Sequence, residues 1–212
     1  MHPYSPQRYR RGAVAGGRSN RRRPGSSGSR RWQILKATTI YRDEWVTHTQ
    51  EHVRLPNGHE IPRYNILNQT DFCTMIAVTP SGLIPLVKQY KHGALEEVME
   101  FPAGLVDKGE TAQDAAIREL REETGYAGNI VFAGRLLTNP TRCRNMAHVF
   151  VITDAVRAAE PRLEVTEDIE VELVHISKLE ELVKSGKFRD VGSLAAYTLA
   201  KASLPDLGWE EV

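Results

Sequence analysis

The sequence has few cysteines and no long apolar run. Its two cysteines, Cys73 and Cys143, are too few for a disulfide framework and are not spaced like zinc ligands. This favours a reducing compartment, and we expect a cytoplasmic protein. The longest apolar stretch, residues 72–87, is interrupted by threonine, serine, proline and glycine. Because a bilayer span needs roughly 18 apolar residues, we predict no transmembrane helix and no membrane partner.

Acidic residues are absent from positions 1–31, which hold nine arginines. Residues 32–212 therefore carry 19 basic and 27 acidic residues, a net charge of about −8, which disfavours nucleic-acid binding by the folded part. Residues 1–31 are rich in Gly, Ser and Pro and have little to bury, so we predict a disordered tail. An organellar transit peptide, an RNA-binding arm, a start codon placed too far upstream and a plain solvated tail all fit this composition.

The 212 residues, 41% of them hydrophobic, suffice for one ordinary domain with an appendage. Residues 32–68 have a strand-like pattern, in which Asn57-Gly58 separates two runs as a hairpin turn would. Further strands are predicted at residues 75–79, 83–89, 98–101, 131–133, 148–152 and 169–176. Helical periodicity marks residues 111–124, 178–185 and 193–202. We therefore predict a mixed α/β fold, without the regular alternation of a doubly wound parallel sheet.

A cluster of glutamates carries the chemical signal. Glu119, Glu122 and Glu123 fall on one side of the predicted helix, at i, i+3 and i+4. Like charges placed in this way repel one another, and a divalent cation would compensate them. Oxygen ligands without nearby cysteine or histidine favour Mg²⁺ first and Mn²⁺ second, and Mg²⁺ held by carboxylates usually binds substrate phosphates. From the spacing alone, a solvated acidic helix face is an equally good interpretation.

The segment from Gly104 to Tyr126 fits a longer motif at every position. It reads Gly-x5-Glu-x7-Arg-Glu-U-x-Glu-Glu-x-Gly-U, where U is a bulky apolar residue, and Leu120 and Tyr126 occupy the two U positions. This pattern is the Nudix box, and the sequence resembles the Nudix hydrolases. Seven fixed identities make a chance match rare, so the match favours a metal site over a solvated acidic helix face.

Residues outside the box narrow the resemblance to the ADP-ribose and nucleoside-diphosphate-sugar pyrophosphatase branch. The run Leu86-Val-Lys-Gln-Tyr-Lys91 is followed by Glu100-Phe-Pro-Ala-Gly104, which leads directly into the box. Pro140 follows Tyr126 by 14 positions, as in that branch. The resemblance covers residues 71–177, about half of the chain, and is weak over residues 32–68.

The resemblance implies an α/β/α sandwich over residues 69–212. A small antiparallel β subdomain, residues 32–68, would precede it and serve dimerisation and the base side of the substrate site. The implied activity is Mg²⁺-dependent hydrolysis of the pyrophosphate bond of ADP-ribose or a related nucleotide sugar, giving a nucleoside monophosphate and a sugar phosphate. A homodimer is expected on the same ground. The alternatives are hydrolysis of dinucleoside polyphosphates or capped RNA, and a non-catalytic module that binds a nucleotide sugar or RNA.

The resemblance also implies the metal ligands. Glu119, Glu123 and the backbone carbonyl of Ala103 would bind the metal ions. Glu122 would be a further ligand or a carboxylate that supports the ligands, and we group it with the catalytic residues.

In this branch another glutamate, from a loop well after the box, acts as general base or metal ligand. Glu164, Glu167 and Glu170 are the candidates here. We choose Glu167, because Glu-Asp-Ile just before a strand fits the branch best. A flexible acidic loop that binds nothing is the alternative.

The remaining motif residues have supporting roles. Arg118 would orient the glutamates through a bidentate ion pair, Glu110 would hold the loop to the helix, and Gly125 stands where a left-handed helix cap is expected. Substrate binding is assigned to Lys91, Glu100, Gly104, Leu105 and Arg142.

Two departures leave the identity of the sugar open. Lys91 stands where relatives commonly have an arginine, which keeps the charge and loses the bidentate fork. The residues after Pro140 lack the glycine-rich turn of strict ADP-ribose enzymes; here Arg142 and Arg144 either bind a phosphate or sugar or belong to a solvated loop. Trp32 and Trp45 either stack on a nucleobase or pack in the core.

Overall fold

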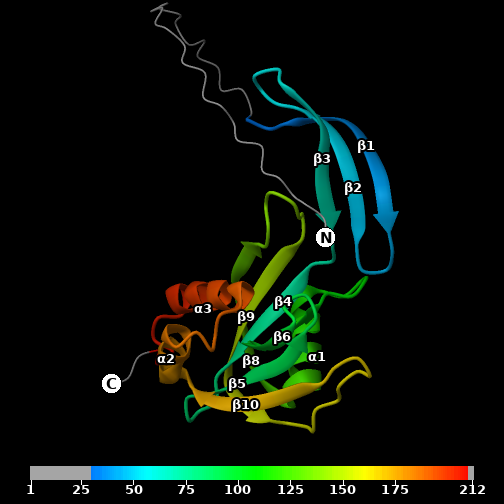
Figure 1. Ribbon diagram of the computed structural model, residues 1–212. Coiled ribbons are helices and arrows are strands. Elements are labelled where there is room, and N and C mark those ends of the chain that lie inside the picture. The colour runs from blue at the N-terminus through cyan, green and yellow to red at the C-terminus, as the bar shows by residue number, and fades with distance from the viewer. Residues whose placement is uncertain (1–29, 210–212) are drawn as a thin grey trace, which may run out of the picture.

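The structure, a computed structural model, describes residues 30–209. The predicted disordered tail, residues 1–31, thus lies outside the described residues apart from Arg30 and Arg31. Figure 1 shows an N-terminal sheet that projects from a larger body of strands and helices. None of the helices within residues 30–209 combines the length and the apolar character needed to cross a bilayer.

The N-terminal sheet is antiparallel, with strand order β1-β2-β3. Its strands are β1 (Gln33–Arg42), β2 (Thr47–Arg54) and β3 (Glu60–Asn68). The predicted hairpin joins β2 to β3, and Gly58 adopts φ 84° in its turn, a left-handed conformation that favours glycine.

The body contains two further sheets (Figure 1). One has the order β7-β4-β9-β8, in which β4 and β9 run parallel and the other pairs are antiparallel. Its strands are β4 (Phe72–Ala77), β7 (Ala103–Leu105), β8 (Tyr126–Leu137) and β9 (Met146–Arg157). The other is antiparallel with the order β10-β5-β6 and consists of β5 (Leu83–Lys91), β6 (Glu96–Glu100) and β10 (Ile169–His175).

Helices cover both faces of the four-stranded sheet. They are α1 (Ala112–Thr124), a short 3-10 turn η1 (Ile176–Lys178), α2 (Leu179–Lys184) and α3 (Val191–Ser203). Along β4, Cys73, Met75 and Ala77 pack in the apolar cluster that includes α1, whereas Ile76 and Val78 pack in the cluster that includes α2 and α3. The alternation of side chains along a strand thus produces an α/β/α arrangement, and the predicted mixed α/β fold is confirmed.

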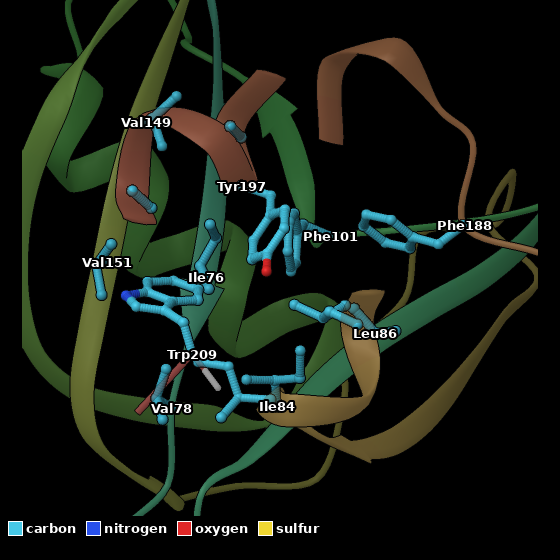
Figure 2. Packing of buried hydrophobic residues seen from close by; sticks show 14 residues of the cluster. Ile76, Val78, Ile84, Leu86, Phe101, Val149, Val151, Phe188, Tyr197 and Trp209 are labelled. Atoms are coloured by element: carbon cyan, nitrogen blue, oxygen red, sulfur yellow. The ribbon is translucent and has the colours of Figure 1, made fainter. Parts of the chain in front are cut away.

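The larger apolar cluster fixes the C-terminal helices against the sheets. Figure 2 shows Tyr197, Trp209 and Ile76 gathered between the strands, with Phe101 and Phe188 beside them. Tyr197 and Trp209 meet edge to face at a centroid distance of 5.5 Å, and Phe101 and Phe188 do so at 5.1 Å. Because only Pro102 separates Phe101 from β7, this packing holds the strand that leads into the box.

Both ends of α1 match the sequence prediction. The hydroxyl of Thr111 accepts a hydrogen bond from the backbone N–H of Asp114 at 3.1 Å. At the other end Gly125 adopts φ 76°, and a Cβ added there would lie 2.2 Å from the carbonyl oxygen of Ala159. Glycine is therefore needed at this cap for its conformation and for the close approach of residues 158–162.

Candidate active site

Arg118 lies at the centre of the acidic cluster that the box predicts on α1. Its guanidinium donates to Glu110 at 2.9 Å, to Glu119 at 2.8 Å and to Glu122 at 3.1 Å. It also donates to the carbonyl oxygen of Leu105 at 3.2 Å. One arginine therefore joins the loop before the helix to two of the three clustered glutamates, as a planar donor with a fixed fork can do.

The third glutamate lies deeper. Glu123 is 3% exposed, and its carboxylate accepts a hydrogen bond from the backbone N–H of Ala103 at 3.0 Å. The backbone of Gly104 passes close to the same helix face, since a Cβ at that position would lie 2.0 Å from the Glu119 carboxyl carbon. The glycine that opens the box thus makes room for the Glu119 side chain.

Burial and mutual repulsion act on these carboxylates. The pKa of Glu123 is raised to about 8, chiefly by burial; the hydrogen bond from Ala103 opposes the rise, and the charges of Glu119, Glu167 and Glu100 add to it. Burial also raises the pKa of Glu119, although the neighbouring guanidinium lowers it. A cation among these carboxylates would offset both costs.

The donor set fits Mg²⁺ or Mn²⁺ in its chemistry, because it consists of carboxylate and backbone oxygens. Within residues 30–209 no three His, Cys, Asp or Glu side chains are already gathered into a ligand group. Glu119 instead points to Arg118, and Glu123 points to the Ala103 N–H. Each of these contacts occupies part of a carboxylate and leaves it further lone pairs, which a metal ion would use.

The candidate loop glutamate lies near this cluster. The charge of Glu167 contributes to the raised pKa values of both Glu119 and Glu123. Its carboxylate accepts a hydrogen bond from the backbone N–H of Glu164 at 2.8 Å, which closes a turn within the loop. Glu170 instead is the second residue of β10, with its carboxylate 3.9 Å from the ammonium of Lys88.

A cavity of about 480 Å³ opens on the other side of the box loop. It is lined by four of the five predicted substrate-binding residues, which are Lys91, Glu100, Gly104 and Leu105. Ala103, a predicted metal ligand, lines it as well. The ammonium of Lys91 lies 2.6 Å from the Glu100 carboxylate, which also accepts from Gln89 at 3.0 Å. Apolar side chains form much of the remaining wall; they are Phe72, Leu136, Leu137, Ala147, Val191 and Ala195.

The sequence reasoning missed the wall that the start of α3 forms. Asp190 caps this helix by accepting from the N–H of Ser193 at 2.7 Å, and both residues line the cavity. The hydroxyl of Ser193 accepts a hydrogen bond from the N–H of Phe101 at 3.1 Å, which joins α3 to the segment between β6 and β7. Asp190 is a residue type that favours a helix N-cap, so the start of α3 could be predicted. No local pattern shows that this helix start packs against Phe101, 92 positions earlier in the sequence.

Arg142 does not reach this cavity. Its guanidinium lies 5.0 Å from the centre of the Tyr64 ring and donates to the carbonyl oxygen of Asn65 at 3.3 Å. Its neighbour Arg144 donates to both oxygens of the buried Glu51, at 2.7 and 2.9 Å. The loop after Pro140 therefore docks on the N-terminal sheet of the same chain, and its part in substrate binding stays a prediction.

The two N-terminal tryptophans are not in the core, so the core-packing interpretation is wrong for both. Trp45 is 64% exposed, and Trp32 is 41% exposed with its ring edge-on to Tyr64 at 5.6 Å. Stacking of these exposed rings on a nucleobase stays a prediction.

Known proteins resemble this chain over most of its described length. An ADP-ribose pyrophosphatase of Bacillus subtilis is 34% identical over 66% of this chain and 75% of its own length. A putative nudix hydrolase 2 of Caenorhabditis elegans is 47% identical over 70% of this chain and 74% of its own. A solved structure of an ADP compounds hydrolase shares the fold, with a TM-score of 0.76 at 21% identity, and matches 87% of this chain and 100% of that one.

The profile of the NUDIX domain matches residues 72–196, which include the box, the acidic cluster and the cavity walls described above. The match covers more than half of the chain, and it begins at β4 and ends within α3. The chain therefore belongs to the Nudix hydrolase family.

Proposed function

We propose that this protein hydrolyses the pyrophosphate bond of ADP-ribose or a related nucleoside diphosphate sugar with the help of Mg²⁺. The products would be a nucleoside monophosphate and a sugar phosphate. The observation that carries the proposal is that β7 separates the acidic cluster from the cavity: its first residue, Ala103, contacts Glu123, and all three of its residues line the cavity. A substrate in the cavity would thus have its phosphates beside the carboxylates.

Glu119 and Glu123 are the residues that would hold the metal, together with Ala103. A bound Mg²⁺ neutralises charge that develops on the phosphate oxygens. Arg118 keeps the carboxylates oriented through its contacts with Glu119 and Glu122. Glu167 would accept a proton from the attacking water, since its charge already acts on Glu119 and Glu123.

Lys91 would hold a substrate phosphate. Its ammonium lines the cavity and is paired with Glu100, a carboxylate that is 9% exposed. Burial raises the pKa of Glu100, and the hydrogen bond from Lys91 opposes this. The pair therefore fixes the position of the ammonium at the cavity wall, where a phosphate can accept from its remaining N–H groups.

We propose that two copies associate through the N-terminal sheet, with residues 32–68 as a separate subdomain before the Nudix domain at 69–212. Among the described residues, β1 pairs with β2 alone, so its second edge carries unpaired backbone groups. Its side chains Ile34, Ile40 and Tyr41 are exposed. Sedimentation equilibrium of the full chain should give twice the monomer mass of 23.8 kDa, whereas a monomer at micromolar concentration would contradict this.

The state of the cysteines is compatible with a reducing, cytoplasmic location. Cys73 and Cys143 are both free thiols. Cys73 is fully buried, and burial raises the pKa of its thiol to about 12. Such a thiol is unreactive, which supports a structural role for it.

The substrate is tested by measuring phosphate released by a coupled phosphatase from ADP-ribose, GDP-mannose, UDP-glucose, NADH and diadenosine polyphosphate. Each is incubated with and without Mg²⁺. We expect Mg²⁺-dependent cleavage of ADP-ribose or another nucleotide sugar. Cleavage of diadenosine polyphosphate alone would replace the proposed substrate class, and silence across the panel would contradict the proposed hydrolysis.

A further inference from the structure

A second concave site lies on the outer side of the box helix. It is a groove of about 410 Å³ between α1 and the segment that follows β9. The groove is lined by Asp114, Ile117, Arg118, Arg121, Glu122, Ala159, Glu160 and Arg162. Because Arg118 and Glu122 belong both to this groove and to the acidic cluster, the groove adjoins the candidate active site, and it shares no lining residue with the 480 Å³ cavity.

Backbone hydrogen bonds hold the far wall of the groove against α1. The N–H groups of Ala158 and Ala159 both donate to the carbonyl oxygen of Gly125, at 2.8 and 3.1 Å. The N–H of Arg162 donates to the carbonyl oxygen of Glu122 at 2.8 Å. The groove is therefore a fixed feature of this fold, with one wall on the helix and the other on residues 158–162.

The three cations of the groove differ in their partners. Arg118 donates to three glutamates at 2.8 to 3.1 Å, so its guanidinium is occupied. Arg121 and Arg162 are exposed, and within residues 30–209 their side chains have no hydrogen-bond or ion-pair partner. Two guanidinium groups thus line the groove without a protein partner among the described residues.

Each acid of the groove, in contrast, already has a partner. Glu122 accepts from Arg118 at 3.1 Å, and Glu160 accepts from Arg157 at 2.6 Å. Asp114 accepts a hydrogen bond from the N-cap hydroxyl at 2.7 Å. The groove therefore has three acidic and three basic side chains, and the two that lack a partner among the described residues, Arg121 and Arg162, are both positive.

We propose that this groove binds a phosphate group between Arg121 and Arg162. Guanidinium groups match phosphate oxygens as bidentate donors, and one ligand bridging the two walls would use both arginines. The ligand is either inorganic phosphate or a small organic monophosphate, such as a sugar phosphate or a nucleoside monophosphate. Ile117, which is 47% exposed in the groove, offers an apolar contact to the organic part of such a ligand.

Occupation of the groove would have a consequence for the candidate catalytic loop. Arg162 lies two residues before Glu164 and five before Glu167. A phosphate held by Arg162 and by Arg121 on α1 would restrain the start of this loop against the helix. Amide hydrogen exchange in residues 160–168 should therefore slow when phosphate is added.

The test is isothermal titration of the full chain at low salt in EDTA, which keeps divalent metal from recruiting phosphate to the acidic cluster. The probes are inorganic phosphate, ribose 5-phosphate and adenosine monophosphate, each titrated separately. The variants are Arg121→Gln and Arg162→Gln, with Arg135→Gln as the control, because Arg135 is an exposed arginine of β8 outside the groove. A Lys91→Ala variant reports binding in the cavity instead.

We expect saturable binding of at least one probe that is about tenfold weaker in Arg121→Gln and in Arg162→Gln and unchanged in Arg135→Gln. Binding that is weakened by Lys91→Ala and not by the two groove variants would place the ligand in the cavity and overturn the proposal. Binding of inorganic phosphate would identify the free ion as sufficient, and binding of the organic phosphates alone would identify a monophosphate ester. Failure of all three probes to bind, or equal binding by the wild type and both groove variants, would overturn the proposal. Because no metal and no turnover are involved, the result is independent of the proposed hydrolysis.

Discussion

At the scale of single residues, Glu123 is the side chain on which the site depends most. It is 3% exposed, and among the described residues its carboxylate has one hydrogen-bond donor, the N–H of Ala103. A carboxylate this buried and this weakly partnered prefers to be protonated, which is why its pKa rises to about 8. The same side chain becomes a strong ligand once a divalent cation favours its ionised form.

This raised pKa predicts how the stability of the metal-free protein depends on pH. The folded-state pKa of Glu123, about 8, exceeds the ordinary value of 4.5. The stability that the protonated group contributes is therefore complete below pH 4.5 and is lost as the pH rises through 8. The slope between these values is at most about 1.4 kcal/mol per pH unit.

Glu123→Gln removes this titration, so the variant should gain stability over the wild type as the pH rises from 5 to 8. Urea denaturation in EDTA at several pH values measures the difference in the free energy of unfolding. A difference that stays constant over this range would show that Glu123 is ionised in the folded metal-free protein.

Lys91 provides a second test at this scale. If its ammonium holds a substrate phosphate, Lys91→Ala should lower kcat/KM for ADP-ribose by about tenfold or more, because a hydrogen bond to a charged group is lost. Lys88→Ala is the matched control, since Lys88 lies on the same strand, pairs with Glu97 at 2.8 Å and does not line the cavity. Equal effects of the two substitutions would remove Lys91 from the substrate site.

At the scale of elements, α1 and its C-terminal cap connect the box to the groove and to the candidate catalytic loop. Gly125 has φ 76°, and an added Cβ would lie 2.2 Å from the carbonyl oxygen of Ala159. Gly58 has a similar φ of 84° but nothing within 4 Å of an added Cβ. Alanine substitutions at these two glycines therefore distinguish two contributions to the loss of folding free energy. Gly58→Ala reports the left-handed conformation alone, and Gly125→Ala reports that conformation together with the close approach to Ala159.

Gly58→Ala should cost about 1 kcal/mol of folding free energy, which is the conformational term alone. Gly125→Ala should cost at least about 2 kcal/mol more, since the Ala159 carbonyl must move. Urea denaturation of both variants measures this difference. Equal losses would mean that the contact with residue 159 relaxes without cost.

The sequence predicts some elements better than others, for physical reasons. The limits of α1 follow from local signals, because the Thr111 cap, the apolar stripe and the left-handed glycine all act within one helix. β7 has only three residues, from Ala103 to Leu105, and no period can be read from so short a strand. The sequence predicts β6 and α1, the elements before and after it along the chain, but not β7 itself.

The candidate site divides in the same way. The acidic cluster lies on one helix, so its geometry could be predicted from spacing together with the box. The cavity wall at Asp190 and Ser193 depends on the packing of α3 against residue 101, which no local pattern reports. Arg142 was assigned to substrate binding from its position after Pro140, whereas its present contacts, with Tyr64 and Asn65, are tertiary.

At the scale of the whole molecule, the ion pair between Glu51 and Arg144 joins the N-terminal sheet to the Nudix domain. Glu51 of β2 is 4% exposed and accepts two hydrogen bonds from Arg144, which is half exposed. The N–H of Leu67 also donates to the carbonyl oxygen of Arg142 at 2.8 Å, and the Tyr64 hydroxyl donates to that of Thr141 at 2.7 Å. The sheet is thereby positioned relative to the body by the chain's own contacts.

Arg144→Ala should destabilise the protein by about 2–4 kcal/mol, because it leaves the Glu51 carboxylate buried without its partner. The double variant Glu51→Gln with Arg144→Ala should lose less, because an uncharged amide is cheaper to bury than an unpaired carboxylate. Thermal or urea unfolding of the set measures this. A double variant less stable than Arg144→Ala would show that the buried charge is not the source of the loss.

We expect Glu123 and its neighbouring glutamates on the box helix to support metal-dependent hydrolysis of a nucleotide sugar in the adjoining cavity. The most direct test is chromatographic analysis of ADP-ribose incubated with Mg²⁺ and either the wild type, Glu123→Gln or Glu160→Gln, the last being an exposed glutamate outside the acidic cluster. We predict that the wild type and Glu160→Gln form adenosine monophosphate and ribose 5-phosphate, and that Glu123→Gln, shown to be folded, forms neither at a comparable rate. Near-normal turnover by Glu123→Gln would contradict the account.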